Sequence, residues 1–114
     1  MPFNDTLLNV GANAMAAAAT HLALHTANPE PSGSNPSSAA RVAAGWSAAA
    51  NGDLSVSNKA FTGGAASGPC THVGFWSAAS GGTFYGSQAL TGDTSFNSAG
   101  EYTITSLTVN GSST

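Results

Sequence analysis

The segment that most constrains the fold is Thr71–Ser87, which reads THVGFWSAASGGTFYGS. Its first part, Thr71–Trp76, alternates between two faces with the period of a pleated strand, and a second short strand is expected over Thr83–Ser87. Between them, Gly81 and Gly82 supply the positive φ that a tight hairpin connection needs. The segment therefore predicts a β-hairpin that gathers four aromatic residues in one ribbon.

Other segments repeat this pattern of short alternating runs closed by turn residues. Such runs at close spacing are typical of an antiparallel sandwich or a small barrel. The expected strands are His21–Thr26, Arg41–Ser47 with Val42, Ala44 and Trp46 on one face, a third strand marked by Leu54 and Val56, a fourth short one closed by Phe61, and Glu101–Asn110.

The last of these strands changes the face on which its large side chains lie. Tyr102 and Ile104 point to one face, whereas Leu107 and Val109 point to the other. Either a bulge intervenes near Thr105-Ser106 or both faces are covered. We favour the bulge, because bulges are frequent near sheet edges.

One helix is expected before the first strand, over residues 5 to about 19. Asn4 or Asp5 can cap its first turn, and the leucines and alanines that follow are good helix formers. Two stripes of small or apolar residues run along it, one with Leu8, Ala12 and Met15 and one with Leu7, Gly11 and Ala18. The helix can therefore lie on a sheet or on a partner.

These elements predict a mainly β protein. We expect an antiparallel β-sandwich, jelly-roll-like or a small barrel, with one N-terminal α-helix. A chain of 114 residues is long enough for one domain with a real core and too short for two. The expected organisation is a single domain over 1–114, with the helix at about 5–19 and the sandwich at 21–111.

The chain carries very little charge, and this limits its partners. Only 6% of its residues are charged, so its surface repels neighbours weakly and favours a homo-oligomer or packing against another protein. Arg41 and Lys59 are the only basic residues besides the histidines, so nucleic acid is not expected as a partner. The acidic balance argues against anionic membranes, and neither a secretory signal nor an apolar run long enough to span a bilayer is recognised.

Catalytic, metal and cofactor chemistry have no recognisable motif in this sequence. His21, His25 and His72 are the candidate metal ligands, but four residues of strand place the first two roughly 13 Å apart, so no metal site is expected. Cys70 reads as a small buried side chain. No nucleophile elbow or phosphate-binding loop is present, so we expect no catalytic residue, no cofactor and no enzyme.

The aromatic residues admit two interpretations. Trp46, Trp76 and Tyr85 could form a platform for sugar rings, as in carbohydrate-binding modules. We favour a core role, because few other large side chains are available to fill a sandwich. The expected core aromatics are Trp46, Phe75, Trp76, Phe84, Tyr85 and Tyr102.

The loops are the expected contact regions. The Pro/Ser/Gly-rich stretch from Asn28 to Ser38 is constrained by three prolines, so it is semi-rigid, and loops of this length commonly contact a partner. The hairpin tip is the second candidate. The candidate contact residues are Asn28, Pro29, Pro31, Asn35, Pro36, Gly81 and Gly82.

Four stretches together resemble a family of small virion-associated proteins of tailed, especially actinobacterial, bacteriophages and prophages. They are ALHTANPEPSGSN (Ala23–Asn35), ARVAAGWSAAANGDLSVSN (Ala40–Asn58), THVGFWSAASGGTFYGS (Thr71–Ser87) and GEYTITSLTVNG (Gly100–Gly111). Members are often labelled tail fibre, head decoration or minor virion proteins. The chain departs from their usual LHTADPG pattern, because Asn28 and Glu30 replace the Asp and the Gly.

This resemblance implies a non-enzymatic structural protein of the virion, made in the host cytoplasm. It would decorate or cement the capsid or tail surface through contacts with capsid or tail proteins. The alternative is a module of a phage fibre that binds carbohydrate on the host surface. The family as it is known contributes no catalytic residues.

Overall fold

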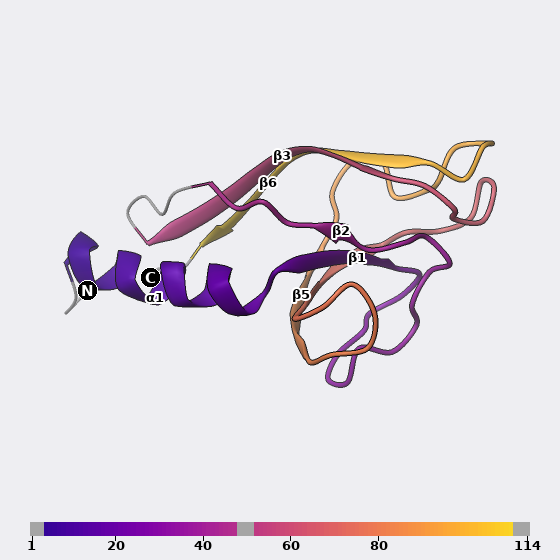
Figure 1. Ribbon diagram of the computed structural model, residues 1–114. Coiled ribbons are helices and arrows are strands. Elements are labelled where there is room, and N and C mark those ends of the chain that lie inside the picture. Colours follow the sequence, from indigo (N-terminus) through magenta and orange to yellow (C-terminus); the bar gives the residue numbers. More distant parts are fainter. Residues whose placement is uncertain (1–3, 48–51, 111–114) are drawn as a thin grey trace.

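The computed structural model describes residues 4–47 and 52–110, and in these ranges it contains two antiparallel sheets and one helix (Figure 1). The elements in chain order are α1 (Asp5–Ala18), β1 (His21–His25), β2 (Val42–Ala43), β3 (Asp53–Phe61), β4 (His72–Trp76), β5 (Phe84–Ala89) and β6 (Tyr102–Asn110). The predicted mainly β class with an N-terminal helix is therefore confirmed.

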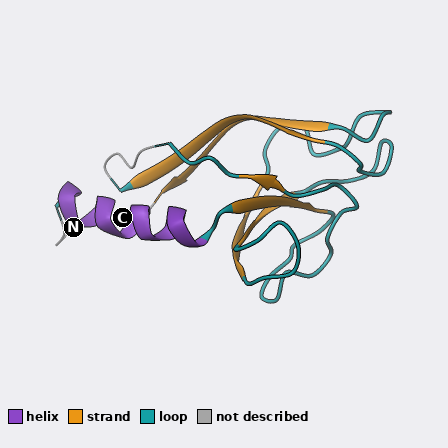
Figure 2. Cartoon of the chain, in the orientation of Figure 1, coloured by secondary structure: helices purple, strands orange, loops and turns teal. Residues whose placement is uncertain are grey.

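The two sheets differ in size. One has four strands in the order β2-β1-β4-β5, and the other is the long ribbon β3-β6 (Figure 2). All pairings are antiparallel, as predicted, and the two sheets do not close on one another in the described residues. The separate fourth strand predicted at Phe61 is wrong, because Phe61 pairs with Tyr102 at the end of the same β3–β6 ladder. The strand predicted over Arg41–Ser47 is reduced to β2.

The hairpin predicted over Thr71–Ser87 is present as β4 and β5. Gly81 and Gly82 at its tip have φ of 64° and 75°, as the predicted turn requires. Trp76 pairs with Phe84 and Phe75 pairs with Gly86, so the register shifts and Tyr85 is left without a partner of its own. The hairpin therefore contains a bulge at Tyr85.

The β3–β6 ribbon keeps one register from end to end, so the bulge predicted near Thr105-Ser106 is wrong. The ladder is interrupted only at Asn58, whose φ is 54°. Burial nevertheless changes parity between Ile104 and Leu107, next to the interruption of the ladder at Asn58. Large side chains from both halves of the ribbon lie in the same core cluster, Val56 and Leu107 from one half and Phe61 and Ile104 from the other.

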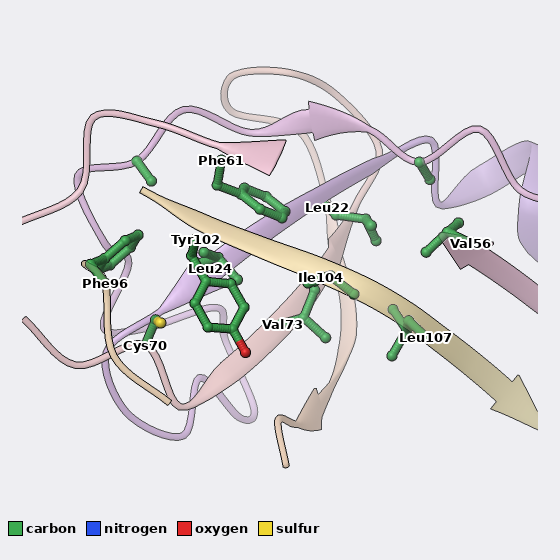
Figure 3. Close-up of a cluster of buried hydrophobic side chains, with 12 residues drawn as sticks. Leu22, Leu24, Val56, Phe61, Cys70, Val73, Phe96, Tyr102, Ile104 and Leu107 are labelled. Carbon is green, nitrogen blue, oxygen red and sulfur yellow. The ribbon is translucent and has the colours of Figure 1, made fainter. Parts of the chain in front are cut away.

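The core lies between the ribbon and the four-stranded sheet (Figure 3). Its central members are Leu22, Leu24, Val56, Phe61, Cys70, Val73, Phe96, Tyr102, Ile104 and Leu107. Cys70 is fully buried, as predicted, and burial, with a smaller effect of the Asp93 carboxylate, raises the pKa of its thiol to about 11. Packing of these side chains holds the two sheets together.

The helix begins and ends close to the predicted positions. The side chain of Asn4 caps it by accepting the N–H of Leu7 at 3.1 Å, and at its other end Ala19 N–H donates to Met15 O at 2.8 Å. It runs beside β3 at one end of a molecule that measures 46 × 26 × 22 Å (Figure 1). No helix in the described part of the chain is long and apolar enough to cross a membrane.

Gly52 shows how closely α1 and the start of β3 approach. Its N–H donates to Asn9 Oδ1 at 2.8 Å, and its φ is 80°. A Cβ at this position would lie 2.7 Å from Leu8 Cβ, so only glycine fits. The sequence Asn51-Gly52-Asp53 is typical of a turn, and Asn51 lies outside the described residues.

Candidate functional site

The outer face of the four-stranded sheet carries a buried histidine and a tryptophan. His25 and Trp76 lie on the face of β1 and β4 that points away from the ribbon, and Gly74 lies between them on the same face. A Cβ on Gly74 would collide with the His25 imidazole and lie 3.1 Å from the indole nitrogen of Trp76. Glycine at this strand position therefore allows the two rings to approach.

The hydrogen bonds of His25 define its protonation state. Its Nε2 accepts the indole N–H of Trp76 at 3.3 Å, so its Nδ1 carries the proton and donates to Ser34 O at 2.9 Å. The pKa of His25 is lowered chiefly by burial, and the positive charge of Arg41 and the neighbouring His72 lower it further. His25 is therefore a neutral structural residue.

Arg41 covers the other side of the Trp76 ring. Its guanidinium carbon lies 3.8 Å from the ring centroid, and the same group donates to Ala78 O at 2.9 Å and Gly81 O at 2.8 Å. Trp76 is thus enclosed, with Arg41 over one face of its ring and His25 at its N–H edge. The interpretation of Trp76 as a sugar platform is wrong, because the residue is only 9% exposed.

The Pro/Ser/Gly-rich loop is fixed on this outer face. Gly33 lies so close to Trp76 that a Cβ there would be 2.6 Å from its ring, and Glu30 accepts the hydroxyl of Ser87 at 2.7 Å. Within the loop, Asn28 Oδ1 accepts Glu30 N–H at 3.0 Å, and Asn35 Nδ2 donates to Asn28 O at 3.1 Å. The predicted semi-rigid loop is therefore an ordered cover of the hairpin.

This placement changes the set of candidate contact residues. Pro29 is fully buried, so its predicted role as a partner contact is wrong. The other candidates are exposed, and their partner contacts stay predictions; they are Asn28, Pro31, Asn35, Pro36, Gly81 and Gly82.

An apolar groove lies on the opposite side of the hairpin, where α1, the ribbon and the β4–β5 hairpin meet. It has a volume of about 240 Å³. It is lined by Met15, Ala18, Ala19, Trp46, Leu54, Phe75, Tyr85 and Val109. No charged side chain is among these residues, so the groove suits an apolar occupant.

Three of the predicted core aromatics, Trp46, Phe75 and Tyr85, line this groove. Trp46 is half-buried, its indole N–H donates to Ala19 O at 2.8 Å, and its ring lies 6.0 Å from that of Phe75. Tyr85 is 54% exposed, so its predicted place in the core is wrong. The bulge in β5 is the physical reason, because it leaves Tyr85 outside the regular pairing of the hairpin.

The remaining predicted aromatics are distributed between the two layers. Tyr102 lies in the main core, Trp76 is buried on the outer face of the sheet, and Phe84 lies beside Trp76 with 5.3 Å between ring centroids. Phe75 is half-buried and packs at the edge of the core. The aromatic hairpin is therefore packed on both faces, by the ribbon on one and by the loop on the other.

A second hollow of about 520 Å³ lies between β5 and β6 and is more polar. Five of its twelve lining residues are Thr or Ser, and Gln88 and Asp93 add further polar groups. Tyr102 reaches its edge and donates its hydroxyl to Asp93 O at 2.5 Å. Within residues 4–47 and 52–110, no group of three His, Cys, Asp or Glu side chains is placed to hold a metal ion.

The fold and the apolar groove define a small, mainly β protein with an aromatic-lined hollow on its surface. Residues 4–112 match the family described as Podophage GP4 fiber I protein gp80, and the chain therefore belongs to this family of phage fibre proteins. The resemblance to virion proteins of tailed phages is confirmed by this match. Comparison with curated proteins gave no match, and comparison with solved structures gave none.

Sequence reasoning missed the roles of His25 and Arg41 in the outer layer. Gly74 between His72 and Trp76 was the available signal, because a glycine inside a strand often marks a close approach of another group. For Met15 and Tyr85 in the groove, no comparable signal exists. The position of Tyr85 depends on the bulge in β5, and that of Met15 depends on the angle between α1 and the strand β1 that follows it.

Proposed function

We propose that the chain is a non-enzymatic structural protein of the phage virion, which decorates or cements the tail or capsid surface through contacts with other virion proteins. The single observation that carries this proposal is the apolar groove beside Tyr85. An uncharged, aromatic-lined hollow of this kind suits an apolar side chain of a neighbouring protein. Membership of a phage fibre family supports the same location on the particle.

The hydrogen-bonding groups of the groove favour a protein neighbour over a sugar. The indole N–H of Trp46 is already donated to Ala19 O, so it is not available to a ligand. Of the lining side chains, only the hydroxyl of Tyr85 remains as a polar group. A sugar presents many hydroxyl groups that this lining would leave unpaired, which costs binding free energy.

Incorporation into particles tests the proposal. A phage lacking its own copy of the gene is complemented with wild-type protein, Tyr85→Ser or the control Ala89→Ser, an exposed position on the same strand. The amount of protein in purified particles is then measured by immunoblotting. We expect wild type and Ala89→Ser to be incorporated and Tyr85→Ser to be reduced at least tenfold. Absence of the wild-type protein from purified particles would contradict the proposal.

The second candidate function is binding of host-surface carbohydrate, as a module of a fibre. The observation that favours it is the stacking surface that Trp46, Phe75 and Tyr85 offer in one groove. Its test is a glycan-binding assay with wild type and Tyr85→Ala. Binding that Tyr85→Ala abolishes without lowering the thermal midpoint would favour this function over the structural one, and no binding by wild type would exclude it.

A further inference from the structure

The two sheets are joined by backbone hydrogen bonds along one side. Residues 40–47, which contain β2, bond in both directions there. Ala44 N–H donates to Thr20 O at 2.8 Å on the side of β1, and Ser47 N–H donates to Ser55 O at 2.8 Å on the side of β3. On the opposite side the outermost strands are β5 and β6, which do not pair with one another in the described residues. The hydrogen-bonded layers are therefore interrupted between β5 and β6.

The free edge of β6 directs backbone groups into the polar hollow at this interruption. Ser55 uses both of its backbone groups on the side of β3 away from β6, because its N–H also donates to Ser47 Oγ at 3.1 Å. Its ladder partner Thr108 must then direct its N–H and C=O away from β3, and Ser106 does the same two residues earlier. Both residues line the hollow, and among the described residues neither has a backbone partner outside the β3–β6 ladder.

The edge of β5 borders the same hollow. Leu90 N–H donates to Thr71 O at 2.8 Å, which is the direction of β4. Backbone groups of successive strand residues point in opposite directions, so the N–H of Ala89 points away from β4. Ala89 is exposed and lines the hollow. Two strand edges thus face one space of about 520 Å³.

The strand β6 lacks the features that normally protect an exposed edge. It is nine residues long, keeps one register with β3, and contains neither a proline nor a charged residue between Tyr102 and Asn110. Natural edge strands are usually shortened, bulged, or blocked by proline or lysine, because an open edge is a template for another strand. The edge of β6 is therefore chemically ready to receive one.

We propose that an extended segment of a neighbouring virion protein lies in this hollow and adds a strand to β6, beside β5. This deepens the proposed structural role and rests on it. The backbone of the segment pairs with the outward N–H and C=O groups of Ser106 and Thr108, which is the way in which an added strand binds a sheet edge. The added strand fills the interruption between the two sheets.

The presence of two edges selects the kind of occupant. A row of backbone donors and acceptors is matched by the backbone of an extended chain, which offers the same groups at the same spacing. A chain placed between two edges must have both of its own edges free. In a second copy of this protein, β6 is already paired with β3 and β5 with β4, so neither strand fits this position. The occupant is therefore an unpaired extended segment of another protein.

The lining of the hollow indicates the side chains of this segment. Leu107 is buried and Leu90 packs against the core, and both line the hollow. Because successive side chains of a strand point to opposite faces, the segment should carry an apolar residue at every second position. Asp93 is the one charged residue of the lining, so an acidic side chain beside it is disfavoured.

Hydrogen–deuterium exchange tests the pairing, with wild type measured free in solution and in purified particles. In the free protein the amides of Ser106 and Thr108 should exchange rapidly, whereas Leu107, whose N–H points to β3, should be protected. In particles the first two amides should exchange roughly tenfold more slowly or less. Equal exchange in both states would overturn the inference. Protection that appears in the purified protein as its concentration rises would assign the edge to a second copy and also overturn it.

The variant Thr108→Pro gives a second readout, with Thr108→Ala as its matched control. Proline removes the N–H that points into the hollow and is tolerated on an edge strand, whereas alanine keeps this N–H. In the particle-incorporation assay Thr108→Pro should be reduced roughly tenfold or more, and Thr108→Ala should match wild type. Wild-type incorporation of Thr108→Pro would overturn the inference.

The thermal midpoint of Thr108→Pro shows whether its fold is kept. If the midpoint falls, exchange of the wild-type amides decides the question alone. A result against the added strand leaves the proposed virion role standing, provided that wild type is present in the particles. Absence of wild type from the particles would contradict both proposals.

Discussion

Trp76 donates its indole N–H to Nε2 of His25 over 3.3 Å, and the two rings stack with 6.2 Å between their centroids at an interplanar angle of 10°. The residues come from β4 and β1, which are 51 positions apart in the sequence. Because Nε2 must accept this bond, it can be made only by the neutral imidazole. The outer layer of the sheet therefore depends on an uncharged His25.

The first prediction is that stability falls when the pH is lowered from 7 to 5. Burial lowers the pKa of folded His25 below its value of 6.5 in the unfolded chain, so the unfolded state binds more protons as the pH falls. The free energy of unfolding is then constant above about pH 7 and decreases progressively below it. Urea unfolding monitored by Trp fluorescence at several pH values measures this slope.

The variant His25→Gln is the comparison for the pH dependence of the free energy of unfolding. An amide can still accept the indole N–H of Trp76 but does not titrate, so the part of the pH dependence that comes from His25 should disappear. His21→Gln, a change at the other end of the same strand, should keep it. An equal slope in His25→Gln and wild type would show that His25 is not the titrating group.

The second prediction concerns Arg41. Arg41→Ala removes the cation over the Trp76 ring and leaves the carbonyls of Ala78 and Gly81 without their donor. The expected loss in the free energy of unfolding is about 1–3 kcal/mol, from one cation–π contact and two exposed or half-buried hydrogen bonds. Urea titration measures it, and Arg41→Lys should retain only part of the stability because lysine lacks the planar fork. If Arg41→Ala left the free energy of unfolding unchanged, the enclosure of Trp76 would be contradicted.

The third prediction compares two glycines that both have positive φ. Gly33→Ala adds a Cβ 2.6 Å from the Trp76 ring in addition to the unfavourable φ of 83°, and should cost about 2–4 kcal/mol. Gly81→Ala has a similar φ of 64° but meets nothing within 4 Å, so it should cost only about 1 kcal/mol. Thermal and urea unfolding of the two variants measure the difference. Equal losses would mean that the loop does not press on Trp76.

The fourth prediction is that Cys70 is chemically inert in the folded protein. Its side chain is fully buried and its pKa is raised to about 11, so the reactive thiolate is scarce at pH 8. Reaction with a thiol-specific reagent should be at least a hundredfold slower than in the urea-unfolded chain. Rapid labelling of the folded protein would show that the core around Cys70 opens easily.

Alternation predicted the sheet well but not what covers it. Leu22 and Leu24 alternate with His and Ala residues and lie in the core, as the sequence indicates. Ala23 and His25 on the other face are equally buried, because a loop more than ten residues long folds back over them. Periodicity predicts which residues share a face of a strand. Whether the outer face, with Ala23 and His25, is also buried depends on tertiary contacts that the local sequence does not encode.

The groove also depends on tertiary structure, so the sequence indicated its aromatic residues but not their arrangement. The crowding of aromatics around Phe75 indicated a nucleus, but of these four residues only Phe75 packs against the main core, whereas Trp76 and Phe84 pack together in the outer layer. The exposure of Tyr85 follows from a bulge that shifts pairing by one residue, and such a shift has no reliable sequence signal. The parity change around Thr105 was visible in the sequence, but it accompanies an interruption of the ladder at Asn58 and not a shift of register.

The structural role is tested most directly by electron cryomicroscopy of purified phage particles that carry this protein. We expect density that fits the two sheets and α1 at repeated positions on the fibre, tail or capsid surface, with the groove beside Tyr85 filled by a side chain from a neighbouring virion protein. Intact particles that show no such density, together with absence of the chain from their protein content, would contradict it.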